Sequence, residues 1–316
     1  MASLAYIQVT RKCNQRCRFC SNPPNKRSIS LEEGQKLIDF YIEEGYEGVI
    51  FTGGEPTLSP ILPDLIKYAC KRGFPNRIIT NGQKLADMEY LKILKDAGLS
   101  NINVSFYSFK KDVQAFLTKK EDSLTNIILA LENLGKIGGI SVNVNTVINH
   151  YNADHLFENV KWIVENFPFV RHFVWNNLDP LMNRARRHPD TIPKLNEFEL
   201  SLQKAMQFLE SKGKTFRLER IPLCYLKGYE HLLNETRKLV KGEERLTFFL
   251  DKRGLLREKE WGQKYGYGKA DCCKVCFLNT ICPGLYQIDR YYSSKELHPV
   301  FVDKKKIIER ILNNDD

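Results

Sequence analysis

Three closely spaced cysteines near the N-terminus constrain this 316-residue chain more than any other feature. Cys13, Cys17 and Cys20 follow the pattern C-x3-C-x2-C, which suits a loop wrapped around a metal better than a disulfide framework. Thiolates are soft ligands that favour zinc, copper(I) and iron–sulfur clusters. A closed structural site needs four protein ligands, whereas a catalytic site leaves one position open. Three thiolates therefore indicate a cluster with a free coordination position, or else a zinc knuckle or a ferredoxin-like loop.

The composition is that of a globular protein, with 42% hydrophobic and 27% charged residues. No apolar run of about 18 residues occurs, so no membrane span is expected. The N-terminus does not read as an export signal, and the nine cysteines are therefore expected to be reduced metal ligands rather than disulfides. This pattern predicts a cytoplasmic protein.

The net charge of +10 permits binding to nucleic acid or to an acidic peptide without establishing either. Most basic residues are scattered among acids, as on solvated helix faces. The local exception is the cluster Arg184-Ala185-Arg186-Arg187-His188. This cluster either contacts an anionic substrate or forms a solvated loop.

Short β-branched segments alternate with amphipathic helices over residues 1–215. The predicted strands are Leu4–Thr10, Gly48–Thr52, Arg77–Thr80, Asn101–Tyr107, Ser141–Ile148 and Val170–Trp175. Such alternation predicts parallel β/α units, and six of them in a row favour a partial (β/α)6 barrel over an open doubly wound sheet. Ligands of β/α barrels bind at the C-terminal ends of the strands. The cysteine loop, Gly53-Gly54-Glu55 and Asn81 follow the first three strands in turn.

The composition changes near Pro222, and we predict a second, smaller domain over residues 216–316. It holds a second set of cysteines, which are Cys224, Cys272, Cys273, Cys276 and Cys282. The remaining cysteine, Cys70, falls in a predicted amphipathic helix and is expected in the core.

The N-terminal motif resembles the signature of the radical S-adenosylmethionine (radical SAM) enzymes, with aromatic Phe19 just before the last cysteine. Gly53-Gly54-Glu55 resembles the GGE motif of the same enzymes. The resemblance implies a [4Fe–4S] cluster on Cys13, Cys17 and Cys20, whose open iron binds S-adenosylmethionine. It also implies cofactor contacts from the GGE residues, and further polar contacts at Asn81, Ser105 and Asn145.

Cys273, Cys276 and Cys282 follow the pattern C-x2-C-x5-C, which resembles part of the auxiliary-cluster module called SPASM, or its shorter relative, the twitch domain. The full pattern continues with a cysteine where this chain has Tyr286. The resemblance thus implies one auxiliary [4Fe–4S] cluster, with Cys224 as its remote ligand. Zinc in the same place is the alternative. Cys272 could replace Cys273 as a ligand, or be a free thiol that returns a hydrogen atom to a substrate radical.

The resemblance implies an enzyme that cleaves S-adenosylmethionine reductively to a 5′-deoxyadenosyl radical, which abstracts a substrate hydrogen atom. It implies an external reductant such as flavodoxin or ferredoxin. A peptide or protein substrate is the first expectation, a small molecule or nucleotide the close alternative, and RNA the third. A rival of a different class is a non-catalytic iron–sulfur electron carrier or zinc protein, for which Cys70 would be a conceivable fourth ligand.

Overall fold

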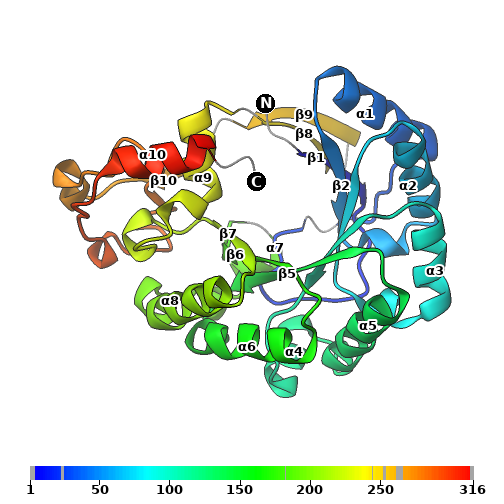
Figure 1. Cartoon of the computed structure of the whole chain (residues 1–316), viewed down its shortest axis with the longest axis horizontal. Coiled ribbons are helices and arrows are strands. Elements are labelled where there is room, and N and C mark those ends of the chain that lie inside the picture. The colour runs from blue at the N-terminus through cyan, green and yellow to red at the C-terminus, as the bar shows by residue number, and fades with distance from the viewer. Residues whose placement is uncertain are drawn as a thin grey trace.

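A curved sheet of nine strands forms the centre of the protein (Figure 1). The computed structural model describes residues 4–22, 25–181, 183–243, 245–251, 254–260 and 266–313. The strands of the sheet are β1 (Leu4–Thr10), β2 (Gly48–Gly53), β3 (Asn76–Thr80), β4 (Asn101–Ser105), β5 (Ser141–Ile148), β6 (His172–Asn177), β7 (Thr215–Glu219), β8 (Arg245–Asp251) and β9 (Gly254–Glu260). Their order is β7-β6-β5-β4-β3-β2-β1-β8-β9, and each neighbouring pair is parallel except β8 and β9. The predicted α/β partial barrel is confirmed, with a larger sheet than the six strands predicted.

Helices cover the outer side of the curved sheet (Figure 1). They are α1 (Leu31–Glu43), α2 (Leu62–Lys71), α3 (Met88–Asp96), α4 (Lys111–Thr118), α5 (Ser123–Ile137), α6 (Leu156–Asn166) and α8 (Leu195–Ser211). Local sequence starts α1, because the Ser30 side chain accepts from Glu33 N while the Glu33 carboxylate accepts from Ser30 N. The short helix α7 (Asn183–Arg187) lies instead within the long connection between β6 and α8.

Alternation along the strands gives the sheet an apolar outer face and a polar inner face. On β5, Val142 and Val144 are buried in the core that the helices share. The intervening amides face the other way. Asn143 Nδ2 donates to Asn103 Oδ1 at 2.8 Å, and Asn103 Nδ2 donates to Asn145 Oδ1 at 3.1 Å. Parallel strands that are buried on both faces are usually apolar throughout, so this amide ladder indicates an inner face that meets polar groups.

The sheet does not end at the predicted domain boundary after residue 215. The strand β7 follows directly on β6 in the sheet, and the β8–β9 hairpin adds to the opposite side of the sheet, where β8 pairs with β1 through Ile7 and Phe248. Four charged residues in β9 hide the strand pattern in the sequence, and such residues are common on edge strands. The boundary at 215 is therefore not a boundary of the sheet.

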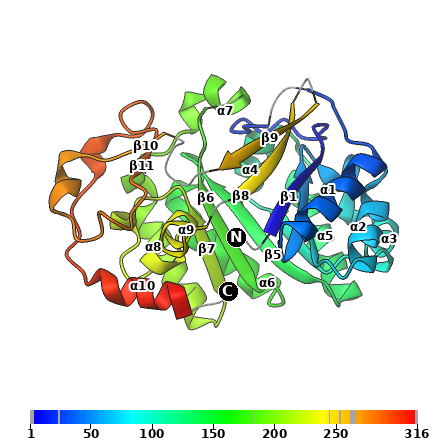
Figure 2. The ribbon, with the colours of Figure 1, turned by 90° about the horizontal axis from the view of Figure 1, so that it is seen from above.

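The C-terminal part of the chain packs beside β6 and β7 (Figures 1 and 2). It contains α9 (Asn234–Lys241), the short pair β10 (Tyr267–Gly268) and β11 (Leu285–Tyr286), and α10 (Lys304–Asn313). Tyr292 Oη donates to the Leu178 carbonyl at 2.7 Å, and Leu278, Leu285 and Ile311 belong to the same buried core as the barrel. Within the described ranges, no helix has the length and apolar character needed to cross a membrane.

Candidate metal centres

The loop after β1 carries Cys13, Cys17 and Cys20 at the rim formed by the C-terminal ends of the parallel strands. The end of α4 holds this loop, since Arg16 N donates to the Thr118 carbonyl at 3.1 Å and Arg18 N donates to the Leu117 carbonyl at 2.8 Å. The last carbonyls of a helix have no partner within it, so α4 offers natural acceptors for a passing loop. All three cysteines are free thiols, with Cys17 buried and Cys13 exposed.

Electrostatics link the three thiols to one another. Desolvation of the thiol by the surrounding protein raises the pKa of Cys13 to about 11, although the residue as a whole is exposed, and the Glu55 and Cys20 charges add to this rise. Burial raises the pKa of Cys17 well above its usual range, and the charges of the other two thiols add to that rise. The nearby Arg184 guanidinium opposes these shifts in Cys13 and Cys17. Metal binding requires thiolates, so such a site needs positive charge to form. A bound metal cluster would supply this positive charge, and the Arg184 guanidinium already provides part of it before a cluster binds.

Gly53 and Gly54 bring the end of β2 into direct contact with the cysteine loop. Gly54 N donates to the Thr10 carbonyl at 2.6 Å, and Glu55 N donates to the Lys12 carbonyl at 2.8 Å. A Cβ atom at Gly53 would lie 2.1 Å from the Thr10 carbonyl oxygen, and one at Gly54 would lie 2.2 Å from that of Lys12. Both positions therefore require glycine because the backbones approach so closely.

The Glu55 carboxylate is buried and fully engaged with neighbouring strand ends. Its Oε1 accepts from Thr57 N at 3.1 Å, from Thr57 Oγ1 at 2.7 Å and from Thr80 Oγ1 at 2.7 Å, and its Oε2 accepts from Asn81 N at 2.7 Å. Burial raises the pKa of the Glu55 carboxyl, while these donors oppose the rise. Glu55 thus ties the end of β2 to the end of β3.

The other three polar residues predicted to contact the cofactor lie on three different strands or strand ends. Asn81 Nδ2 donates to Asn14 Oδ1 at 2.8 Å and contacts Cys13 Sγ at 3.8 Å, so Asn81 belongs to the cysteine loop's surroundings. Ser105 ends β4 and hydrogen-bonds the Tyr107 hydroxyl. Asn145 lies on the inner face of β5, in the amide ladder.

Sequence patterns did not assign two residues, Tyr107 and Arg184, to this site. Tyr107 is buried with its ring against Phe19, 4.7 Å between centroids, and the charges of all three loop thiols act on its hydroxyl. Sequence patterns placed Tyr107 only at the end of a predicted strand, and the GGE-like motif did not indicate a role for it near the cysteine loop. Arg184 Nε donates to the Cys17 carbonyl at 2.8 Å, and Arg184 N donates to the Cys20 carbonyl at 3.2 Å. The basic cluster is therefore more than a solvated loop, since its first residue holds the cysteine loop.

Cys70 lies at the opposite end of the barrel from the cysteine loop. A Cβ atom built at Gly98, which precedes β4, would lie 2.7 Å from Cys70 Sγ. The N-terminal ends of the strands are on that side, so Cys70 cannot serve as a fourth ligand for the loop. Its predicted burial is wrong, because Leu65, Ile66 and Ala69 form the buried face of α2 and Cys70 is exposed beside them.

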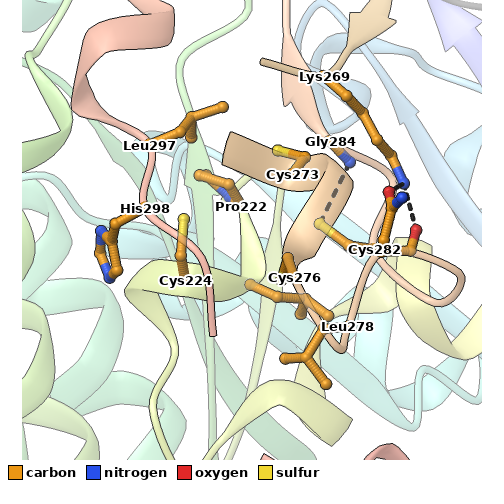
Figure 3. Close-up of a pocket in the computed structure, with 12 residues that line it drawn as sticks. Pro222, Cys224, Lys269, Cys273, Cys276, Leu278, Cys282, Gly284, Leu297 and His298 are labelled. Carbon is orange, nitrogen blue, oxygen red and sulfur yellow. Dashed lines mark hydrogen bonds between the residues drawn. The ribbon is translucent and has the colours of Figure 1, made fainter. Parts of the chain in front are cut away.

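Four cysteines of the C-terminal set line a single pocket (Figure 3). They are Cys224, Cys273, Cys276 and Cys282, which come from two separate stretches of the chain. Cys272 is not among the lining residues, and its Sγ contacts the Leu297 carbonyl at 3.6 Å. Tyr286, which stands where the longer pattern has a cysteine, instead donates to Asp179 Oδ1 at 3.2 Å.

Backbone N–H groups donate to three of the four sulfurs of this pocket. Val300 N donates to Cys276 Sγ and Gly284 N donates to Cys282 Sγ, both at 3.3 Å. Burial raises the pKa of Cys224 to about 12, and a backbone hydrogen bond from His298 opposes that rise. N–H donors of this kind stabilise thiolates and tune the potential of iron–sulfur clusters.

The donor sets differ in what they can hold. Three loop thiols with an adjacent arginine fit a cluster that leaves one position for another ligand, and four pocket thiols with amide donors fit a closed site. Across the described ranges, no three His, Cys, Asp or Glu side chains are arranged to hold a single metal ion. Each thiolate of a [4Fe–4S] cluster binds a different iron, so the fit rests on donor chemistry rather than on convergence at one point.

Residues 7–163 match the family model described as Radical SAM superfamily. The chain belongs to this superfamily of enzymes. The match contains the cysteine loop, the GGE-like turn and the inner-face amides of β4 and β5.

Two curated relatives illustrate the similarity in sequence. The 7,8-dihydro-6-hydroxymethylpterin dimethyltransferase of Methanocaldococcus jannaschii is 34% identical over 346 residues, with 98% of this chain and 65% of that protein covered. The GTP 3′,8-cyclase of Nautilia profundicola is 35% identical over 150 residues, with 45% of this chain and 46% of that protein covered. The chain thus spans about half to two thirds of the length of these relatives.

Two solved structures share the fold. Streptococcus suis SuiB bound to S-adenosylmethionine has a TM-score of 0.64 at 15% identity, with 90% of this chain and 72% of that chain covered. The enzyme anSMEcpe with bound AdoMet and the Cp18Cys peptide has a TM-score of 0.64 at 17% identity, with 98% and 97% covered. At this identity the likeness concerns the fold alone.

Proposed function

We propose that the protein uses Cys13, Cys17 and Cys20 to hold a [4Fe–4S] cluster that binds S-adenosylmethionine at its open iron. When bound, this cofactor pair supplies reductive cleavage to a 5′-deoxyadenosyl radical, which abstracts a hydrogen atom from the substrate. The observation that carries the proposal is the set of three free thiols at the C-terminal rim of the barrel, packed against Gly53 and Gly54.

The chain's own residues then have distinct roles around the cofactor. Gly53 and Gly54 fix the loop through backbone contacts, and Asn81 donates toward Cys13. We assign Glu55 as a positioning residue, because its carboxylate is committed to Thr57, Thr80 and Asn81 rather than free for an ammonium group. The inner-face residues Ser105 and Asn145 are then left to meet the cofactor or the substrate.

We further propose that Cys224, Cys273, Cys276 and Cys282 hold one auxiliary [4Fe–4S] cluster in a twitch-like region. The shared pocket and the amide donors to its sulfurs support this assignment. Cys272 lies outside the pocket lining, which favours Cys273 as the ligand. A hydrogen-donor role for Cys272 stays a prediction, which Cys272→Ala with unchanged turnover and iron would remove.

The substrate is best sought among small polar heterocycles. The relative that covers 98% of this chain is named as a pterin dimethyltransferase, and another as a GTP cyclase. The amide ladder of Asn103, Asn143 and Asn145 suits the donors and acceptors of such rings. A peptide or protein substrate is the second candidate, supported by the near-complete overlap with the fold of anSMEcpe, which was solved with a peptide. The net charge alone supports RNA.

Anaerobic reconstitution with iron and sulfide tests the proposal, with iron counting and an assay for 5′-deoxyadenosine in the presence of dithionite. About eight irons and cofactor cleavage are expected, because two four-iron clusters are proposed. About four irons with cleavage would remove the auxiliary cluster. Bound zinc without cleavage would contradict the enzyme function and favour the structural-metal alternative.

A further inference from the structure

Four exposed apolar side chains gather beside the second cysteine site. Phe277 is 58% exposed and Phe301 is 61% exposed, and their rings meet edge to face with 5.4 Å between centroids. Val275 is 61% exposed and Val302 is 36% exposed, next to these rings in sequence. We call these four residues the Phe277 patch. Single exposed apolar residues are normal, but clustered ones mark interaction surfaces.

The Phe277 patch is built on the wall of the four-cysteine pocket. Val275 and Phe277 flank Cys276, whose Sγ accepts from Val300 N at 3.3 Å. Phe277 N in turn donates to the Val300 carbonyl at 2.9 Å. Because these bonds join the two segments at Cys276, a partner seated on the patch would be separated from the pocket by little more than this pair of segments.

Lysines predominate around the Phe277 patch. Lys274 lies between Val275 and the paired cysteines, while Lys304, Lys305 and Lys306 follow Val302. Lys304 Nζ reaches Thr280 Oγ1 at 3.2 Å, which places the start of α10 beside the loop after Phe277. The nearby acids are Asp271, which pairs with Lys274, and Asp303, which accepts from Lys305 N. The surroundings therefore carry more positive than negative charge.

We propose that the Phe277 patch is the docking surface for a small acidic one-electron carrier, of the flavodoxin or ferredoxin kind. Basic residues around an apolar centre complement an acidic partner and steer its approach. The inference rests on the proposed auxiliary cluster. The carrier loses one electron and is oxidised, while the protein's redox centre next to the patch gains that electron and is reduced.

A flavodoxin serves as the probe, with the reconstituted full-length protein. The first variant, Phe277→Ser with Phe301→Ser, removes the ring pair. The second, Lys305→Glu with Lys306→Glu, reverses two exposed charges and leaves the packing intact. The matched controls are Ile93→Ser on α3, which is also exposed, and Lys67→Glu with Lys71→Glu on α2. Both control helices lie on the far side of the molecule from α10 (Figures 1 and 2).

The expected result is a dissociation constant for flavodoxin weakened by about tenfold or more in the phenylalanine variant, since central aromatic residues dominate small interfaces. The lysine variant should lose affinity at low salt, with a deficit that shrinks as salt rises. Oxidation of reduced flavodoxin on mixing should slow in parallel. The controls should match the wild type.

Dithionite-driven cofactor cleavage separates this inference from the proposed function, because dithionite is small and needs no docking surface. It should stay within about twofold of wild type in both patch variants, because neither variant alters a residue proposed to bind the clusters or the cofactor. Unchanged flavodoxin binding in both patch variants would overturn the docking proposal alone. An absence of cleavage in the wild type would instead overturn the proposed function.

Discussion

The two cysteine sites of this protein differ in how much of the fold each one needs. The N-terminal loop places three thiols within eight residues and is held from outside, by β2, by the end of α4 and by Arg184. The C-terminal pocket draws one thiol from residue 224 and three from residues 273–282, and backbone N–H groups of the C-terminal part donate to three of the four sulfurs. The open site is therefore held mainly by strands and helices around the loop, whereas the donors of the closed site come from the part of the chain that also supplies its thiols.

Removal of a loop cysteine should have the largest effect. Cys17→Ala is expected to lower cofactor cleavage at least about 1,000-fold, because a missing thiolate leaves the proposed catalytic cluster without one of its three protein ligands. About four irons should be lost and about four retained. Assays of 5′-deoxyadenosine and iron check this, with Cys70→Ala as the control that should retain both. Full activity in Cys17→Ala would contradict the assignment of the N-terminal loop as the cluster site with an open coordination position.

The C-terminal pair Cys272 and Cys273 offers a matched test of the closed site. Cys273→Ala is expected to lose about four irons, because Cys273 lines the pocket, while Cys272→Ala should retain its iron. Iron counting and the absorbance of the reconstituted proteins measure the difference. The reverse pattern would move the ligand role to Cys272 and contradict the pocket assignment.

A methyl group at Gly54 should disturb the cysteine loop, because Gly54 holds the end of β2 directly against that loop. Gly54→Ala places a Cβ atom 2.2 Å from the Lys12 carbonyl oxygen, and backbone must shift to relieve the clash. We expect a loss of about 2–3 kcal/mol of unfolding free energy together with loss of the loop cluster. Gly73→Ala is the control, because its Cβ atom would meet nothing within 4 Å and only its positive φ costs about 1 kcal/mol. Equal denaturation midpoints for Gly54→Ala and Gly73→Ala would contradict the role of β2 in holding the cysteine loop.

The smallest effect is expected at Tyr107. Tyr107→Phe keeps the ring on Phe19 but removes the hydroxyl beside Ser105 and the loop thiols. A lost hydrogen bond of about 1 kcal/mol should slow cofactor cleavage by less than about tenfold. Tyr68→Phe, which removes a hydroxyl bonded to Asp39 on α1, is the control. A fall as large as that of Cys17→Ala would make Tyr107 a catalytic residue.

Local pattern predicted most of the barrel, because each β/α unit carries its own periodicity. The strands Leu4–Thr10 and Ser141–Ile148 have their predicted bounds. The β8 strand was missed because its place beside β1 depends on a return across the whole sheet. No short-range pattern encodes that pairing, and the charged residues of β9 conceal the hairpin.

The candidate sites were predictable where chemistry is concentrated in sequence. Spacing together with the family resemblance gave the seven proposed cysteine ligands, with Cys272 left as an alternative to Cys273, and the pocket brings together the four C-terminal ones. Arg184 and Tyr107 were not assigned to the loop site, because they reach it from distant elements through backbone and electrostatic contacts. Glu55 was assigned for cofactor contact, but only the structure shows its carboxylate bound to Thr57, Thr80 and Asn81.

Electron paramagnetic resonance of the dithionite-reduced protein, with and without S-adenosylmethionine, tests the central claim most directly. The open loop cluster should change its signal when the cofactor binds, while the closed C-terminal cluster should not. The signal that responds should be absent from Cys17→Ala and present in Cys273→Ala. A response that persists in Cys17→Ala, or spectra that S-adenosylmethionine leaves unchanged, would contradict the division of the protein into one open and one closed site.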